Sequence, residues 1–276
     1  MSEWRNDVLK TRVDHVFEKI KTIPSDLRSG RCLDIGCGMG GGVIAALKHG
    51  ASLSVGIDRN LNEFQHDMNF ARFGEACNFF QVNADQAVMI QADVFKCDVF
   101  RGYFDYCILV DTIEHVPNQR EFIRYAYRSL KPGGVLLVDT CPLYYSPVGH
   151  HLWQWFPKES DPWAHLRSDF DERLKAKGVD QWTIERYRQL NRVTYSEVID
   201  MVSEAGFTVV RTNQQAPRSE MVSLYEKYGA LIDVEIPVPK DCLFQDWIEV
   251  VARKDGWLKR LTKRLGRRVR RIAGRS

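Results

Sequence analysis

The chain has 276 residues, a length that suits one α/β domain with insertions better than two full domains. Hydrophobic residues make up 44% of it, enough for a core, and we expect neither a signal peptide nor a transmembrane helix. The net charge of +3 conceals a split, because residues 253–276 hold eleven Lys and Arg and one acid, Asp255, while the remaining body is acidic. An acidic body is unlike an enzyme that presents a basic face to nucleic acid, so no nucleic-acid partner is expected.

The seven cysteines are odd in number and show no CxxC spacing. Several lie in segments that read as strands, where a reduced thiol acts as a small core side chain. This usage argues against structural zinc and favours a cytoplasmic protein.

The first expected element is a helix within residues 1–30. Its apolar residues recur at helical spacing among charges, and Pro24, Ser25 and Gly30 mark its end. This helix either covers a bound cofactor or only caps the sheet, and capping is the favoured interpretation.

Residues 31–42 read as a short strand that ends in an acid and enters a glycine-rich turn before an apolar helix. Such a turn brings backbone N–H groups close to a ligand. Gly36, Gly38 and Gly41 would allow a dinucleotide. Asp34, Gly36, Gly38 and Gly40 instead fit acid-x-Gly-x-Gly-x-Gly, and the Asp34 carboxylate would repel a pyrophosphate while attracting a ligand that carries an ammonium and a sulfonium cation.

The next two expected strands, over residues 52–58 and 88–93, also end in acids. Asp58, with Arg59 beside it, is placed to accept the hydroxyls of a ribose. Asp93 and the backbone at Val94 are candidates for the adenine amino group, and Asp85 remains the alternative register.

The fourth expected strand covers residues 104–111 and leads into Asp111, Glu114 and His115. Ligands lie beyond the carboxyl ends of strands in open α/β sheets, so these side chains are expected to face the reaction site. A helix to Leu130 and a Lys-Pro-Gly-Gly turn then precede a fifth strand over residues 135–140.

Taken in order, these acids, glycines and turns resemble class I S-adenosylmethionine-dependent methyltransferases that act on small molecules, lipids and sugars. The likeness covers residues 31–140 and resumes at 194–210 and 246–253. It implies a Rossmann-like, seven-stranded, mostly parallel sheet with helices on both faces and an antiparallel last strand. It further implies a methyltransferase domain over residues 31–254 that binds S-adenosylmethionine through Asp34, Gly36, Gly38, Gly40, Asp58, Arg59, Asp93, Val94 and Asp111.

Two insertions interrupt the likeness, at residues 141–192 and 215–245. The first is rich in aromatic residues, which predicts a lid over the acceptor, although such residues also form small cores. An acceptor hydroxyl needs a base, and His115, His150 and His151 are the candidates. Each of the three also fits a purely structural role.

Asp111, Glu114 and His115 resemble the magnesium-binding run of some ubiquinone-pathway O-methyltransferases, which makes magnesium a second cofactor hypothesis. A divalent ion would lower the pKa of an acceptor hydroxyl.

In residues 255–276, apolar side chains share one face of an expected helix and Lys and Arg cover the other. This pattern is typical of a helix that lies on an anionic membrane surface, which would place the protein at the inner face of a membrane. We therefore expect an O-methyltransferase acting on a sugar of a surface glycan, or on a quinone or phenolic lipid. A dinucleotide oxidoreductase and a non-catalytic binding protein remain alternatives.

Overall fold

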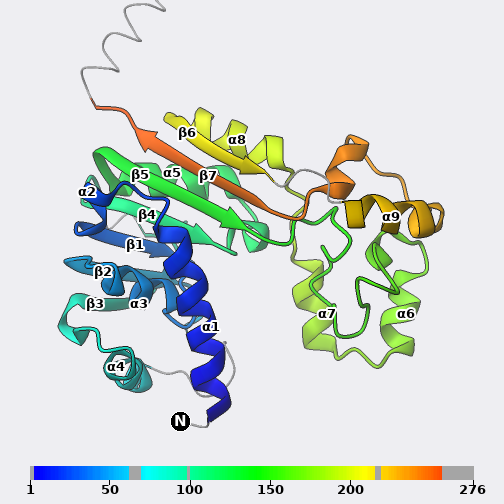
Figure 1. Ribbon diagram of the computed structural model, residues 1–276, viewed down its shortest axis with the longest axis horizontal. Coiled ribbons are helices and arrows are strands. Elements are labelled where there is room, and N and C mark those ends of the chain that lie inside the picture. Colours follow the sequence, from blue (N-terminus) through cyan, green and yellow to red (C-terminus); the bar gives the residue numbers. More distant parts are fainter. Residues whose placement is uncertain (1–2, 62–69, 98–99, 215–218, 257–276) are drawn as a thin grey trace, which may run out of the picture.

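Seven strands form one sheet in the order β3-β2-β1-β4-β5-β7-β6 in the computed structural model (Figure 1). The structure describes residues 3–61, 70–97, 100–214 and 219–256. The strands are β1 (Arg31–Ile35), β2 (Leu53–Asp58), β3 (Ala87–Gln91), β4 (Phe104–Val110), β5 (Leu130–Thr140), β6 (Phe207–Gln214) and β7 (Ile248–Lys254). Strand β7 is antiparallel to both of its neighbours, β5 and β6, and the other neighbouring strands pair in parallel, which confirms the expected Rossmann-like architecture.

Helices cover both faces of this sheet. The helices in the described part of the chain are α1 (Glu3–Ile20), α2 (Ser25–Arg28), α3 (Gly41–Lys48), α4 (Phe70–Phe79), α5 (Gln119–Ser129), α6 (Phe170–Ala176), α7 (Gln181–Arg188), α8 (Tyr195–Glu204) and α9 (Ser219–Tyr228), and of these α6, α7 and α9 lie away from the sheet. Helices α1 and α3 bury their apolar faces on one side of β1, β4 and β5, and α5 and α8 pack on the other side. The central strands are therefore buried on both faces, as their continuous apolar sequences require.

Several predicted boundaries differ from the observed ones by a few residues. Strand β3 ends at Gln91, so Asp93 follows its carboxyl end, whereas Asp85 lies in a 3₁₀ turn before the strand. The structure therefore favours the Asp93 register. Strand β5 begins at Leu130 instead of Val135, because Leu130 pairs with Phe104 before the register shifts. Residues 62–69, which precede α4, lie outside the described residues.

The first insertion, residues 141–192, forms a lobe with α9 beyond the end toward which β5 runs (Figure 1). Most of its aromatic residues build two small cores of their own, with Phe156 and Trp163 fully buried. Trp153 and Trp182 are exceptions, at 57% and 53% exposed. The aromatic residues of this segment thus serve mainly to hold the lobe together.

The membrane-surface prediction falls on residues 257–276, which lie outside the described part of the chain. Among the described residues, no helix combines the length and the apolar character needed to cross a bilayer.

Candidate active site

Three cavities meet at Gly36, where the carboxyl ends of β1, β2 and β4 lie side by side. This is the edge of an open α/β sheet at which ligands bind. One cavity runs toward Asp93, one toward helix α7 of the lobe, and one between the glycine loop and helix α1. We treat the three together as one cleft and name them the Asp93, α7 and α1 cavities.

The glycine loop turns at this edge with a left-handed backbone. Gly36, Gly38 and Gly40 have φ values of 79°, 50° and 83°, a region that side chains rarely adopt. A Cβ atom on Gly36 would lie 2.2 Å from the side chain of Thr112, so the loop and the end of β4 approach each other closely. Gly36 lines all three cavities and Gly38 lines the α1 cavity. Gly40, the residue before α3, packs instead against Phe73 of α4.

Asp58, at the end of β2, is hydrogen-bonded to this loop. Its carboxylate accepts hydrogen bonds from the backbone N–H of Gly38 at 3.0 Å and of Asn60 at 2.9 Å. Asp58 and Arg59 line both the Asp93 and the α7 cavities. An acid at this place can bind two neighbouring hydroxyls and orient the loop at the same time.

The Asp93 cavity is a slot with mainly apolar walls. Asp93 lies at its rim and accepts a hydrogen bond from the backbone N–H of Phe95 at 3.0 Å. Val94, Val116 and Phe122 contribute apolar surface. Apolar walls with an acid beside them suit a planar heterocycle that carries an amino group.

The role predicted for Asp34 is not supported by its position. Its side chain is 4% exposed and none of the three cavities is lined by it. The carboxyl group packs against the first turn of α3, where a Cβ on Gly42 would lie 2.3 Å from Oδ2. Burial raises the pKa of Asp34 to about 7, with Arg12 opposing that shift and Asp58 adding to it. Asp34 therefore lies beneath the loop and outside the cleft.

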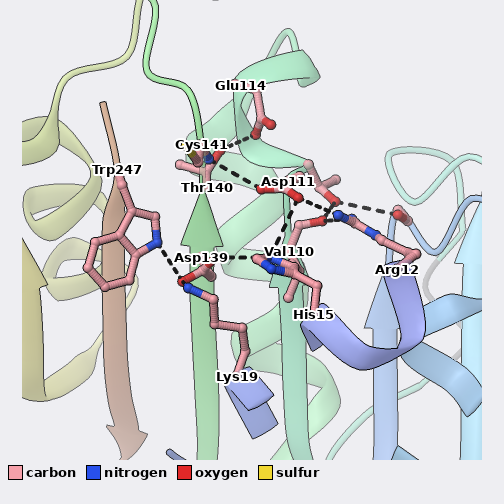
Figure 2. A network of polar contacts seen from close by, with 12 residues as sticks. Arg12, His15, Lys19, Val110, Asp111, Glu114, Asp139, Thr140, Cys141 and Trp247 are labelled. Carbon is pink, nitrogen blue, oxygen red and sulfur yellow. Dashed lines mark hydrogen bonds and ion pairs between the residues drawn. The ribbon is translucent and has the colours of Figure 1, made fainter. Parts of the chain in front are cut away.

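Helix α1 contributes residues that the sequence analysis left out of the site. The Arg12 guanidinium donates to the Asp111 carboxylate and, at 2.7 Å, to the carbonyl oxygen of Val110 (Figure 2). Val8, Thr11, Arg12 and His15 line the α1 cavity, so the helix covers the cleft as well as the sheet, against the favoured interpretation. Their spacing places them on one helix face, which is the signal that could have revealed them.

Asp111 and Asp139 form an acidic pair at the ends of β4 and β5 (Figure 2). Asp111 has a φ of 46° and accepts a hydrogen bond from the backbone N–H of Cys141 at 3.2 Å. The fully buried Asp139 is bound through Oδ2 by Lys19 Nζ and by Trp247 Nε1, both at 2.8 Å. His15 lies between the two acids.

The predicted magnesium ligands do not form a cluster. Glu114 is 2% exposed and its carboxyl group accepts a hydrogen bond from Thr140. Burial, with a smaller contribution from Asp111, raises the pKa of Glu114 to about 8, so this group is largely protonated at neutral pH. Within the described ranges, the three-residue group with suitable spacing is instead His15, Asp111 and Asp139. The proposed use of Asp111, Glu114 and His115 as a metal site is thus unsupported.

We expect Glu114→Gln to change how stability depends on pH. The unfolded carboxyl group loses its proton near pH 4.5 and the folded one near pH 8, so deprotonation favours the unfolded state across that interval. Relative to wild type, the variant should gain about 3–4 kcal/mol of unfolding free energy between pH 5 and pH 8. Urea unfolding at both values measures this gain. Glu226→Gln, at an exposed position on α9, is the control and should show none.

The three candidate bases occupy different surroundings. His115 lines the Asp93 and α7 cavities, and burial lowers its pKa to about 3. His151 packs edge-to-face on His115, with its Nε2 3.2 Å from the carbonyl oxygen of Pro142. His150 is fully buried among Phe156, His165 and Phe170, so the structure does not bring it to the cleft.

One face of α7 forms the outer wall of the α7 cavity. Trp182, Glu185, Arg186 and Gln189 line it opposite Asp58, Asp111, Thr112 and His115. The Arg186 guanidinium lies over the Trp182 ring at 4.8 Å from its centroid. An aromatic face with charged neighbours opposite the glycine loop suits a ring-shaped polar acceptor.

The sequence profile of the methyltransferase domain family matches residues 1–212. A curated relative, the ubiquinone biosynthesis O-methyltransferase of Rickettsia prowazekii, is 26% identical over 159 residues, which cover 55% of this chain and 59% of the relative. The chain thus spans less than two thirds of the length of that relative.

Two solved structures share the fold. An S-adenosylmethionine-dependent methyltransferase from Mesorhizobium loti superposes with a TM-score of 0.51 at 18% identity, covering 86% of this chain and 95% of the other. Phosphoethanolamine N-methyltransferase 2 of Haemonchus contortus, solved in complex with S-adenosyl-L-methionine, gives a TM-score of 0.51 at 18% identity over 82% of this chain and 49% of the other.

Proposed function

The chain belongs to the methyltransferase domain family, and from that premise we propose that it binds S-adenosylmethionine in the cleft around Gly36 and methylates a hydroxyl group on a ring-shaped acceptor. The observation that carries this proposal is the conjunction of a left-handed glycine loop with Asp58 at the end of β2. The loop leaves no room for a side chain at Gly36, and Asp58 is the acid beside it.

The donor set fits this cofactor. Asp58 would bind the ribose hydroxyls, and the apolar walls near Val94 and Phe122 would enclose the adenine, with Asp93 at the rim. Arg12, which lines the α1 cavity, would attract the cofactor's carboxylate. When bound, S-adenosylmethionine supplies an electrophilic methyl group on a sulfonium centre and leaves as a neutral thioether.

The α7 cavity is the proposed acceptor site. It adjoins Gly36 and Asp111, and its outer wall brings the Trp182 ring opposite the glycine loop. Such a ring stacks on a phenol or on a sugar and helps to exclude water. The named function of the Rickettsia relative favours a phenolic acceptor over the sugar that the sequence analysis preferred. The chain's residues would orient the acceptor oxygen and remove its proton.

Methyl transfer tests the proposal directly. Full-length protein would be incubated with methyl-labelled S-adenosylmethionine and, in separate reactions, with catechol, methyl glucoside or phosphoethanolamine, and the products identified by mass spectrometry. We expect a methyl ether of catechol. Label found only on the amine would contradict an O-methyltransferase.

Trp182→Ala is expected to raise KM for catechol about tenfold with little change in kcat, because loss of a stacked ring costs about 1 kcal/mol or more. Trp153→Ala is the matched control, since Trp153 is similarly exposed and lines none of the three cavities. Initial rates at varied catechol concentration measure both variants. Equal effects from the two would show that Trp182 does not contact the acceptor.

A further inference from the structure

We propose that His15 of helix α1 is the general base of this enzyme, accepting the acceptor's hydroxyl proton on Nε2. His15 is on the helix face that covers the cleft and lines the α1 cavity together with Gly36 and Asp111, two residues that also line the adjoining α7 cavity proposed for the acceptor. This inference rests on the proposed hydroxyl methylation and adds the group that carries the proton.

Two carboxylate oxygens flank Nε2 of His15. His15 Nε2 lies 3.9 Å from Asp111 Oδ2 and 3.8 Å from Asp139 Oδ1 (Figure 2). Both distances are too long for a direct hydrogen bond and short enough for a single bridging oxygen. The Oδ1 atom of Asp139 is buried and has no hydrogen-bond partner. A hydroxyl at this point would donate its proton to Nε2, and the two carboxylates would then stabilise the imidazolium that forms.

The same two acids stabilise a protonated ring. Burial lowers the pKa of His15 from its usual value, so the ring is neutral at pH 7 and able to take a proton. Asp111 and Asp139 oppose that shift, while Lys19 and Arg12 add to it. The four charged groups face the ring from α1, β5 and the end of β4, and their mutual ion pairs hold the carboxylates in place.

The other histidines are less suited to this task. His115 is close to the cleft, but burial lowers its pKa to about 3 and its one acidic neighbour is the largely protonated Glu114 at 3.8 Å. His150 is enclosed in the lobe core. Of the histidines in the described part of the chain, His15 is the one placed between two carboxylates within 4 Å.

A divalent cation is the rival occupant of the same triangle, because an imidazole and two carboxylates are suitable ligands. Arg12 and Lys19 already balance the charges of Asp111 and Asp139. A dication would therefore leave two excess positive charges beside a cationic cofactor, whereas a transferred proton leaves one. Charge thus favours the base.

The step is balanced. As the acceptor oxygen gains the methyl group, its O–H bond breaks and the proton passes to Nε2 of His15. The electron pair of the broken C–S bond stays on the sulfur. The imidazolium then returns the proton to water, so no oxidant or further reactant is needed.

A pair of acceptors separates a base from a structural residue. Catechol must lose a proton during the reaction, whereas 4-nitrocatechol is largely ionised at pH 7.5 before it binds. His15→Asn should lower kcat for catechol by about 10²–10³-fold and leave kcat for 4-nitrocatechol within about threefold of wild type. The wild-type enzyme should also lose activity on catechol as the pH falls. The pH profile of the variant should not show this loss.

Lys10→Ala, on the exposed side of α1, is the fold control, and His115→Asn tests the rival base. In the cofactor-free protein, NMR titration should show that Asp139→Asn lowers the pKa of His15. Calorimetry with S-adenosylhomocysteine should give His15→Asn a wild-type Kd.

Several outcomes would overturn the assignment. Equal losses with both phenols would make His15 structural, and a selective loss in His115→Asn would move the base there. If EDTA inactivated the enzyme and manganese restored its activity, a metal ion bound by His15, Asp111 and Asp139 would replace the general base in this account. Failure of the wild type to methylate either phenol would remove both the base and the hydroxyl acceptor, whereas failure to bind S-adenosylhomocysteine would refute the proposed function itself.

Discussion

Gly36→Ala is expected to abolish cofactor binding and to lower the unfolding free energy by about 2–4 kcal/mol. Two costs add. The backbone at Gly36 has a φ of 79°, which strains any residue with a side chain. The new methyl group would also lie 2.2 Å from Thr112, at the point where all three cavities meet. Denaturant unfolding and calorimetry with S-adenosylhomocysteine measure the two effects.

Gly50→Ala separates the strain from the clash. Gly50 has a φ of 92° and a Cβ there would meet nothing within 4 Å, so this variant carries the strain alone. It should lose about 1 kcal/mol and bind the cofactor product normally. Adding Thr112→Ala to Gly36→Ala should recover part of the stability. If the Gly36 and Gly50 variants behaved alike, the close approach of the loop to β4 would be wrong.

Asp58→Ala should weaken S-adenosylhomocysteine binding by about 100-fold or more, while the fold stays intact. Hydrogen bonds to a charged group contribute about 1.5–3 kcal/mol each, and two ribose hydroxyls would lose theirs. The loop would also lose the acceptor for the N–H of Gly38.

Two further variants sharpen this test. Asp58→Asn keeps one acceptor oxygen and should bind with intermediate affinity. Asp85→Ala removes the acid of the alternative register, in the 3₁₀ turn before β3, and should bind as wild type does. A loss of affinity in Asp85→Ala equal to that in Asp58→Ala would place the ligand elsewhere.

Much of the fold could be read from the sequence because its signals are local. The apolar runs ending in Asp34 and Asp58 each mark a parallel strand buried on both faces, and the structure has strands there. Helix α8 begins after Thr194 because Thr194 and Glu197 form a capping box, a signal that is local in the sequence.

The site was harder to predict, because several of its residues are placed by contacts between segments that are distant in sequence. Arg12 and Asp111 are paired across 99 positions of sequence, and nothing local to α1 fixes that pairing. Asp34 is the acid that the glycine-loop motif requires, yet α3 packs over its carboxyl group at Gly42 and keeps it out of the cavities. His150 and His151 are adjacent in sequence, but the fold of the lobe encloses the first and brings the second against His115.

The identity of the cofactor is the claim on which the rest depends. Gly41, which would complete a dinucleotide loop, instead lies under Arg12, where a Cβ would be 2.7 Å from the aliphatic Cγ. Helix α1 therefore packs directly against the start of α3 at this glycine. Calorimetric titration of the full chain with S-adenosylhomocysteine and, separately, with NAD tests this most directly. We predict saturable binding of the first, lost in Asp58→Ala, and none of the second; binding of NAD without S-adenosylhomocysteine would contradict the account.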